Sequence, residues 1–90
     1  MKKITDDLEI TGIDINMYGK LHGAEITLCF LGEYFARAMY YENSTGNSYF
    51  ETTGKSSKVH ESFSDEVEDN ENEIIEWVNE QIKADKLSKD

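Results

Sequence analysis

A period-two alternation of apolar and polar residues runs through most of residues 8–53 and limits what this chain can fold into. Successive side chains of a β-strand point to opposite faces of a sheet, so the alternation predicts half-buried strands. Within residues 8–18 the apolar positions change phase once, at Gly12. A one-residue phase change at a glycine is typical of a β-bulge, which lets both halves of a strand keep one face inward. We therefore predict a bulged first strand.

Further alternating segments follow, separated by clusters of turn-forming residues. The predicted strands cover residues 24–31, 34–41 and 48–53, and the turns lie at 19–23, Gly32-Glu33 and 42–47. Consecutive strands with short connections usually pair as antiparallel neighbours. Residues 59–63 fit either a fifth short strand or extended chain. We expect residues 8–53 to form a four-stranded, or with this addition five-stranded, antiparallel β-meander.

The stretch from Glu61 to Glu80 concentrates negative charge and also has an apolar stripe. It holds nine of the nineteen acidic residues of the protein and no lysine or arginine. Its second half has apolar residues at helical spacing. These are Ile74, Trp77, Val78 and Ile82. One element is therefore expected to pack by one face and to hold out a dense negative field on the other.

This stretch predicts a single C-terminal helix within an acidic segment, residues 64–86. Ser64 and Asn70 are both suitable N-cap residues, so the helix should begin between Ser64 and Asn72. A helix with one apolar stripe buries it best against one face of the sheet, which gives an α+β fold. The expected architecture is a β-meander with one C-terminal helix packed on one face.

The whole chain, residues 1–90, is expected to be one domain, because ninety residues suffice for one modest core. Residues 1–7 are polar and are expected to be frayed. The sequence leaves open which face of the sheet the helix covers. Ala36 and Ala38 are small enough for a helix to approach closely, and Trp77 would then pack near them.

The net charge of −10 narrows the classes of partner. It argues against direct binding of nucleic acid and against anionic membranes, because both require Lys and Arg to neutralise phosphates. Lys2 and Lys3 are followed by no apolar h-region, so we expect no signal peptide. Cys29 is the only cysteine and fits a small buried hydrophobe in a reducing cytosol. We expect a cytoplasmic protein with a basic partner.

Enzyme and metal chemistry have little support in the sequence. His22 and His60 are the only histidines, and chance alone places carboxylates beside them among nineteen acids. The acidic positions between Asp65 and Glu76 match a calcium-binding loop poorly, since Asn70 stands where that loop needs glycine. We therefore expect no enzyme and assign no catalytic, cofactor-binding or metal-binding residue.

The best candidate site is the acidic surface of the helical segment. Glu73, Glu76 and Glu80 recur at helical spacing on one side of the expected helix, partly away from its apolar stripe. Like charges at this spacing destabilise a helix, which suggests a use for the field, such as steering toward a basic groove. The expected partner-binding residues are Glu66, Glu68, Asp69, Glu71, Glu73, Glu76 and Glu80.

An aromatic sheet face offers an alternative, because aromatic residues are enriched at protein interfaces. The residues that would form this face are Phe35, Met39, Tyr41, Tyr49 and Phe50. In this interpretation the protein is a small homo-oligomeric adaptor or structural module, for example a homodimer, and the charge serves solubility.

A compact β-meander that carries the acidic run Glu61–Glu80 resembles, as a type, the small acidic proteins that phages encode to disarm host defences. That class includes DNA-mimic inhibitors and several anti-CRISPR proteins. The resemblance implies a non-enzymatic inhibitor in the cytoplasm of the host cell. Its carboxylates would stand in for phosphates in the nucleic-acid-binding groove of a CRISPR effector or of a restriction or repair enzyme.

Overall fold

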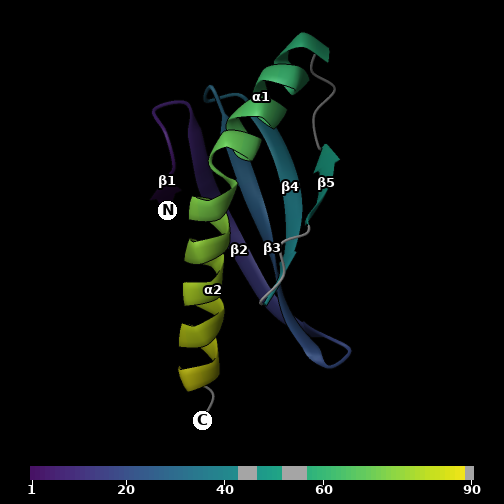
Figure 1. The fold of residues 1–90 in the computed structure, drawn as a ribbon, viewed down its shortest axis with the longest axis vertical. Coiled ribbons are helices and arrows are strands. Elements are labelled where there is room, and N and C mark those ends of the chain that lie inside the picture. Colours follow the sequence, from purple (N-terminus) through teal and green to yellow (C-terminus); the bar gives the residue numbers. More distant parts are fainter. Residues whose placement is uncertain (43–46, 52–56, 89–90) are drawn as a thin grey trace.

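The computed structural model describes residues 1–42, 47–51 and 57–88 of the chain, with side chains for residues 1–42 and 59–88 (Figure 1). The predicted α+β class is confirmed, with two helices rather than one. The elements in chain order are β1 (Lys2–Lys3), β2 (Leu8–Tyr18), β3 (Leu21–Phe30), β4 (Tyr34–Tyr41), β5 (Asn47–Glu51), α1 (Ser57–Asp69) and α2 (Glu71–Ser88).

The sheet is an antiparallel meander in the order β1-β2-β3-β4-β5. Strands β2 to β5 are the four that the alternation predicts. The additional strand is β1, from a segment expected to be frayed, where Lys2 pairs with Ile10 and Lys3 with Glu9. The predicted turn at 42–47 falls partly outside the described residues, as does the end of the predicted strand 48–53.

The bulge predicted in the first strand is present. The pairing of β2 with β3 shifts between Ile10 and Gly12, which leaves Thr11 as the extra residue. On one side of the shift Ile10 is fully buried, and on the other Ile13 lies opposite buried Ile26 and packs against the core. The extra residue keeps both halves facing the same core, as the phase change at Gly12 predicts.

One of the predicted turns is shorter than expected and another is shifted by one residue. The β2–β3 hairpin closes at Gly19 and Lys20 alone, with a positive φ of 66° at Gly19, as a type II′ turn requires. At the β3–β4 hairpin the residues with positive φ are Leu31 (56°) and Gly32 (73°), one position before the expected Gly32-Glu33 turn. The amide of Glu33 donates to the carbonyl of Phe30 at 3.3 Å and closes this turn.

The start expected for the helix, between Ser64 and Asn72, is wrong, because α1 already begins at Ser57. The fifth strand considered at 59–63 is helical for the same reason. Val59, Phe63 and Val67 recur every fourth residue, and Phe63 and Val67 are 1% exposed against the sheet. This stripe gives α1 a buried face, which is hard to recognise in the sequence because polar residues surround its few apolar positions.

Asn70 divides the helical segment into two. Its amide donates to the carbonyl of Val67 at 3.1 Å, and its side-chain Nδ2 donates to the carbonyl of Glu66 at 2.8 Å, which closes the last turn of α1. The carbonyl of Asn70 accepts the amide of Ile74 at 3.1 Å and begins α2. Asn70 therefore holds the N-cap position that its spacing from Glu73 predicts, while its side chain caps the preceding helix.

Both helices cover one face of the sheet and leave the other open (Figure 1). Ala36 and Ala38 lie on the covered face at 1% and 0% exposure, and their small side chains let the helices approach the sheet closely. Trp77, which was expected near these alanines, is half-buried, packs against the core and lines a hollow together with Lys2 of β1. Three members of the predicted helical stripe are buried: Ile74, Val78 and Ile82.

Two buried tyrosines of β4 connect the sheet to the helices through their hydroxyl groups. Tyr34 is fully buried, and its Oη lies 2.8 Å from Nδ1 of His60 on α1. Tyr40 is 1% exposed, and its hydroxyl donates to Glu71 of α2 at 3.2 Å. Buried phenols need such partners, so these two bonds help to set where each helix sits along β4.

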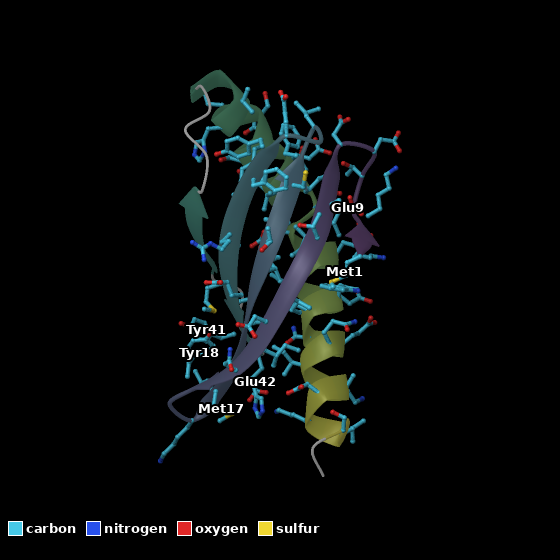
Figure 2. All side chains as sticks on the ribbon, turned by 180° about the vertical axis from the view of Figure 1, so that it is seen from behind. Met1, Glu9, Met17, Tyr18, Tyr41 and Glu42 are labelled. Carbon is cyan, nitrogen blue, oxygen red and sulfur yellow. The ribbon has the colours of Figure 1, made fainter. Side chains whose placement is uncertain are left out.

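The open face carries a second pair of tyrosines, over a glycine (Figure 2). The rings of Tyr18 and Tyr41 meet edge to face, with centroids 5.8 Å apart and planes at 87°. A Cβ atom on Gly23 would lie 2.7 Å from Cδ2 of Tyr18 and 3.1 Å from Cδ1 of Tyr41. The absence of a side chain at Gly23 therefore makes room for this aromatic pair.

We expect the Gly23→Ala substitution to destabilise the protein by about 1 to 2 kcal/mol, because the methyl group displaces both rings and weakens their edge-to-face contact. The matched control is Gly12→Ala in β2, whose Cβ would meet Thr27 Oγ1 at an ordinary 3.6 Å. Urea unfolding of both variants measures the difference. Equal midpoints for the two variants would contradict the proposed role of Gly23.

Candidate protein-binding surface

The acidic residues predicted for partner binding lie on α1 and α2, and most of them face solvent. Those that are exposed are Glu68, Asp69, Glu73, Glu76 and Glu80. Two further exposed acids on α1, Glu61 and Asp65, were not among the predicted residues. With Glu68 they follow the i, i+4, i+7 spacing of one helix side, a signal that becomes visible once α1 begins at Ser57. We call these seven residues the acidic face.

Two predicted residues are placed differently. Glu71 is half-buried and accepts the hydroxyl hydrogen bond of Tyr40, so it serves the contact between α2 and β4. Its position three residues before buried Ile74 on the same helix was a signal for this orientation. Glu66 is also half-buried, and its backbone carbonyl accepts the Asn70 side chain. The structure therefore does not bring Glu71 together with Glu73, Glu76 and Glu80.

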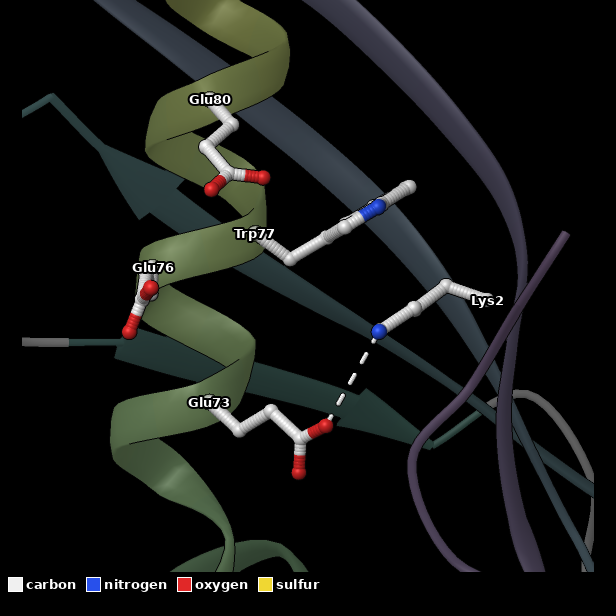
Figure 3. A pocket seen from close by; sticks show the side chains of 5 residues that line it. All are labelled: Lys2, Glu73, Glu76, Trp77 and Glu80. Carbon is white, nitrogen blue, oxygen red and sulfur yellow. Dashed lines mark ion pairs between the residues drawn. The ribbon is translucent and has the colours of Figure 1, made fainter.

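Glu73, Glu76 and Glu80 of the acidic face are among the residues that line a shallow hollow beside α2 (Figure 3). The hollow has a volume of about 320 Å³ and is lined by Lys2, Glu73, Glu76, Trp77 and Glu80. Figure 3 shows Trp77 projecting from α2 on the same side as Lys2. Nζ of Lys2 lies 3.9 Å from Oε1 of Glu73, and both side chains are more than one-third exposed, so this pair adds little stability. The sequence pattern gave no signal for Lys2 here.

The C-terminal end of α2 is held to the sheet by an ion pair. Glu42, at the end of β4, forms an ion pair with Lys86, and Nδ1 of His22 lies 3.9 Å from the same carboxylate (Figure 2 marks Glu42). A hydrogen bond from Lys86, assisted by the positive charge of Lys86, lowers the pKa of Glu42 despite an opposing effect of desolvation. This contact joins residues 44 positions apart in the chain, so local sequence patterns could not predict it.

We expect Glu42→Gln to be less stable than the parent protein at neutral pH and to approach it in acid. Because folding lowers the pKa of Glu42 below its ordinary value of 4.5, the stabilisation is fully present above that value. It is lost as the pH falls through the lower pKa of the folded state. Urea midpoints of both proteins, measured from neutral pH down to about pH 3, test this. A difference that stays constant over this range would contradict it.

The two histidines lie at different places and are engaged structurally. His22 is beside Glu42, while His60 contacts Tyr34 and also packs near Phe63, with ring centroids 6.4 Å apart. Within residues 1–42, 47–51 and 57–88, no group of three or more His, Cys, Asp or Glu residues could hold a metal ion. Residues 65–76 are helical except for Asn70, so the calcium-loop alternative has no loop there.

The open sheet face, which the alternative interface would use, carries both apolar and charged side chains. Phe35 and Tyr41 are each 36% exposed, and Met39 is half-buried. Arg37 lies on the same face, 3.6 Å from Glu25. Cys29 is buried, as predicted. Side chains of Tyr49 and Phe50, the other predicted members of this face, lie outside the described residues.

The fold and the surface together define a small α+β domain with an acidic helical layer on one face of an antiparallel sheet. Comparison with protein-family models, with curated proteins and with solved structures finds no match. Neither helix, over the part of the chain that the structure describes, has the length and apolar character needed to cross a membrane.

Proposed function

We propose that this protein is a non-enzymatic inhibitor that binds the basic nucleic-acid-binding groove of a host defence protein through its acidic face. The observation that carries the proposal is the exposure of Glu76 and Glu80 with no cation paired to them among the described side chains. Only Glu73 of the acidic face has a lysine partner there, and that contact is long, at 3.9 Å. The charge is thus available to a partner.

The length of the acidic face suits a nucleic-acid groove. The helices follow one another along the sheet (Figure 1), and Glu61 to Glu80 extend over about 30 Å at 1.5 Å per residue. This is close to the ~34 Å of one turn of a DNA duplex. A row of carboxylates over that length offers a basic groove a substitute for several phosphates, with the strong salt dependence of phosphate binding.

The acidic face also has an energetic argument for a function. Like charges three or four residues apart each destabilise a helix by about 0.2 to 0.5 kcal/mol. The exposed sides of α1 and α2 accumulate several such pairs, among them Asp65 with Glu68 and Glu76 with Glu80. A domain of this size has a small margin of stability. Uncompensated repulsion on a helix that is otherwise well packed fits a surface adapted to bind an opposite charge.

A competition experiment tests the proposal. Purified CRISPR effectors, restriction enzymes and repair enzymes are loaded with fluorescently labelled nucleic acid and titrated with the protein at ~50 mM and ~500 mM salt. We expect at least one enzyme to release its nucleic acid at low salt and to retain it at high salt. Retention by every enzyme at low salt, or release that does not depend on salt, would overturn the proposal.

The exposure of Phe35 and Tyr41 on the open face favours one alternative, a small homo-oligomeric adaptor or structural module that uses the aromatic sheet face. Sedimentation at high protein concentration distinguishes this alternative. A protein that stays strictly monomeric has no homodimer interface on that face, whereas a dimer that Tyr41→Lys dissociates would support it.

A further inference from the structure

The outer edge of β2 is only partly paired. Strand β1 covers it at Glu9 and Ile10 and nowhere else. From Thr11 to Tyr18 no strand among the described residues pairs with this edge, although the inner edge pairs with β3 as far as Tyr18. Such an edge presents backbone N–H and C=O groups in the spacing that an added strand would use. Over eight residues it is roughly 27 Å long.

The core is open along the same length. Leu8 and Ile10, in the part of β2 beside β1, are fully buried. Beyond the end of β1, Ile13 and Ile15 are only half-buried although they lie opposite fully buried residues of β3, and Met17 is 53% exposed. The apolar margin of the core therefore lacks a cover where the edge lacks a strand. An added strand would pair with the free edge of β2 and would also cover the exposed apolar side chains.

The hollow beside α2 adjoins Lys2, the first residue of β1. Lys2 lines the hollow and pairs with Ile10, the last residue of β2 that β1 covers. Paired residues share a face, so Lys2 lies on the helix-covered face with Ile10, and its Nζ reaches Glu73. A strand that continued the line of β1 would direct alternate side chains to this face, toward Trp77 and Glu80 (Figure 3).

Lys2 thus already makes, within the protein, the contact that a basic strand at this edge would repeat. Figure 3 shows Glu80 on the same side of α2 as Glu73, and the two residues are ~10.5 Å apart along the helix axis, while alternate residues of a strand are ~6.8 Å apart. A long basic side chain two or four residues along the strand from the position of Lys2 can therefore reach Glu80. The indole of Trp77 in the same hollow can stack with a guanidinium group.

We propose that an extended segment of the partner, with arginine or lysine at alternate positions, adds as a strand to β2 from Thr11 onward and places its basic side chains in the hollow beside Trp77. This inference rests on the proposed function for the basic character of the partner. A second copy of the chain is a poorer occupant, because β2–β2 pairing would bring the glutamates of two hollows toward each other.

A synthetic peptide in which arginine and valine alternate, as long as the edge Thr11–Tyr18, tests the inference. One control peptide has the same composition with all arginines grouped at one end. A second is the alternating peptide with N-methyl groups on alternate residues, which removes the hydrogen bonds to a neighbouring strand. Trp77 is the only tryptophan, so its fluorescence reports binding, and amide chemical shifts locate it.

We expect the alternating peptide to bind roughly tenfold tighter than either control and to shift the amides of Thr11 to Met17 together with the Trp77 indole. Equal affinity for the three peptides, or shifts confined to the open face, would overturn strand addition. So would amide shifts along β2 caused by self-association without peptide, which would assign the edge to a second copy.

The outcome separates this inference from the proposed function. The variant Glu76→Lys with Glu80→Lys is tested in parallel, both with the peptides and in the nucleic-acid competition. If the variant loses both activities while N-methylation has no effect, strand addition is wrong and the inhibitor proposal stands. If the alternating peptide binds as expected but no enzyme releases nucleic acid, the edge is a binding site and the inhibitor proposal fails.

Discussion

Changing Glu73, Glu76 and Glu80 together to lysine is expected to slow association with a basic partner by ~10-fold to 10³-fold at low salt. The three carboxylates lie within about two turns of α2 beside one hollow, so their electric fields add there. Each change adds two charges, so the net charge moves from −10 to −4. Stopped-flow association rates, measured with the enzyme that the competition experiment identifies, give the effect directly. The difference from the parent should shrink as salt rises, because screening removes the attraction in both proteins.

The matched control reverses Asp6, Asp7 and Glu33, which are exposed and lie outside the helices at one end of the sheet. This variant has the same net charge of −4, since three reversals again add six charges to −10. We expect it to lose far less of the association rate. Equal losses of association rate in the two variants would show that binding depends on the net charge of the protein and not on the position of the acidic face.

Replacing Phe63 by alanine is expected to destabilise the protein by about 3 to 5 kcal/mol. Phe63 is 1% exposed, and its ring centroid lies 5.1 Å from that of Tyr34 and 6.0 Å from that of Phe30. It is the largest buried side chain of α1, so its loss removes most of the apolar contact of this helix with the sheet. For a domain of this size the loss is a large share of the total stability.

Urea unfolding followed by circular dichroism measures this effect, and limited proteolysis shows whether α1 separates first. Leu87→Ala on α2 is the control, because that side chain is 68% exposed and its removal should change stability by less than about 0.5 kcal/mol. A Phe63→Ala protein as stable as the control would mean that α1 is held by other contacts. The acids of α1 would then not depend on this ring for their position.

The strands could be predicted because their signals are local, whereas the face that the helices cover was left open. The alternation in β2 and the phase change at Gly12 depend only on the period of a strand, and the small side chains of Ala36 and Ala38 indicated where a helix could approach. The exposure of Glu73, Glu76 and Glu80 followed from the position of the apolar stripe in α2. These features could be predicted because they depend on residues that are close together in the chain.

The beginning of the helical layer was missed for the opposite reason. The early turns of α1 have an unremarkable local pattern, with Val59 and Phe63 four residues apart among polar residues. Their helical conformation becomes favourable only when Phe63 is buried against Phe30 and Tyr34, which are distant in the chain. The place of Lys2 and the pair of Glu42 with Lys86 also depend on contacts between remote segments. The periodicity of neighbouring residues in the chain does not reveal these contacts.

The unpaired edge from Thr11 to Tyr18 has a consequence for the purified protein itself. A strand margin of this length is a template for intermolecular stacking, and negative charge is what keeps molecules apart at neutral pH. Near the isoelectric point of about 4.5 the net charge falls to zero and this repulsion is lost, so we expect turbid, fibril-forming solutions there, before the hydrophobic interior is exposed. Light scattering on mild acidification, compared with the circular dichroism signal, would record the order of these events.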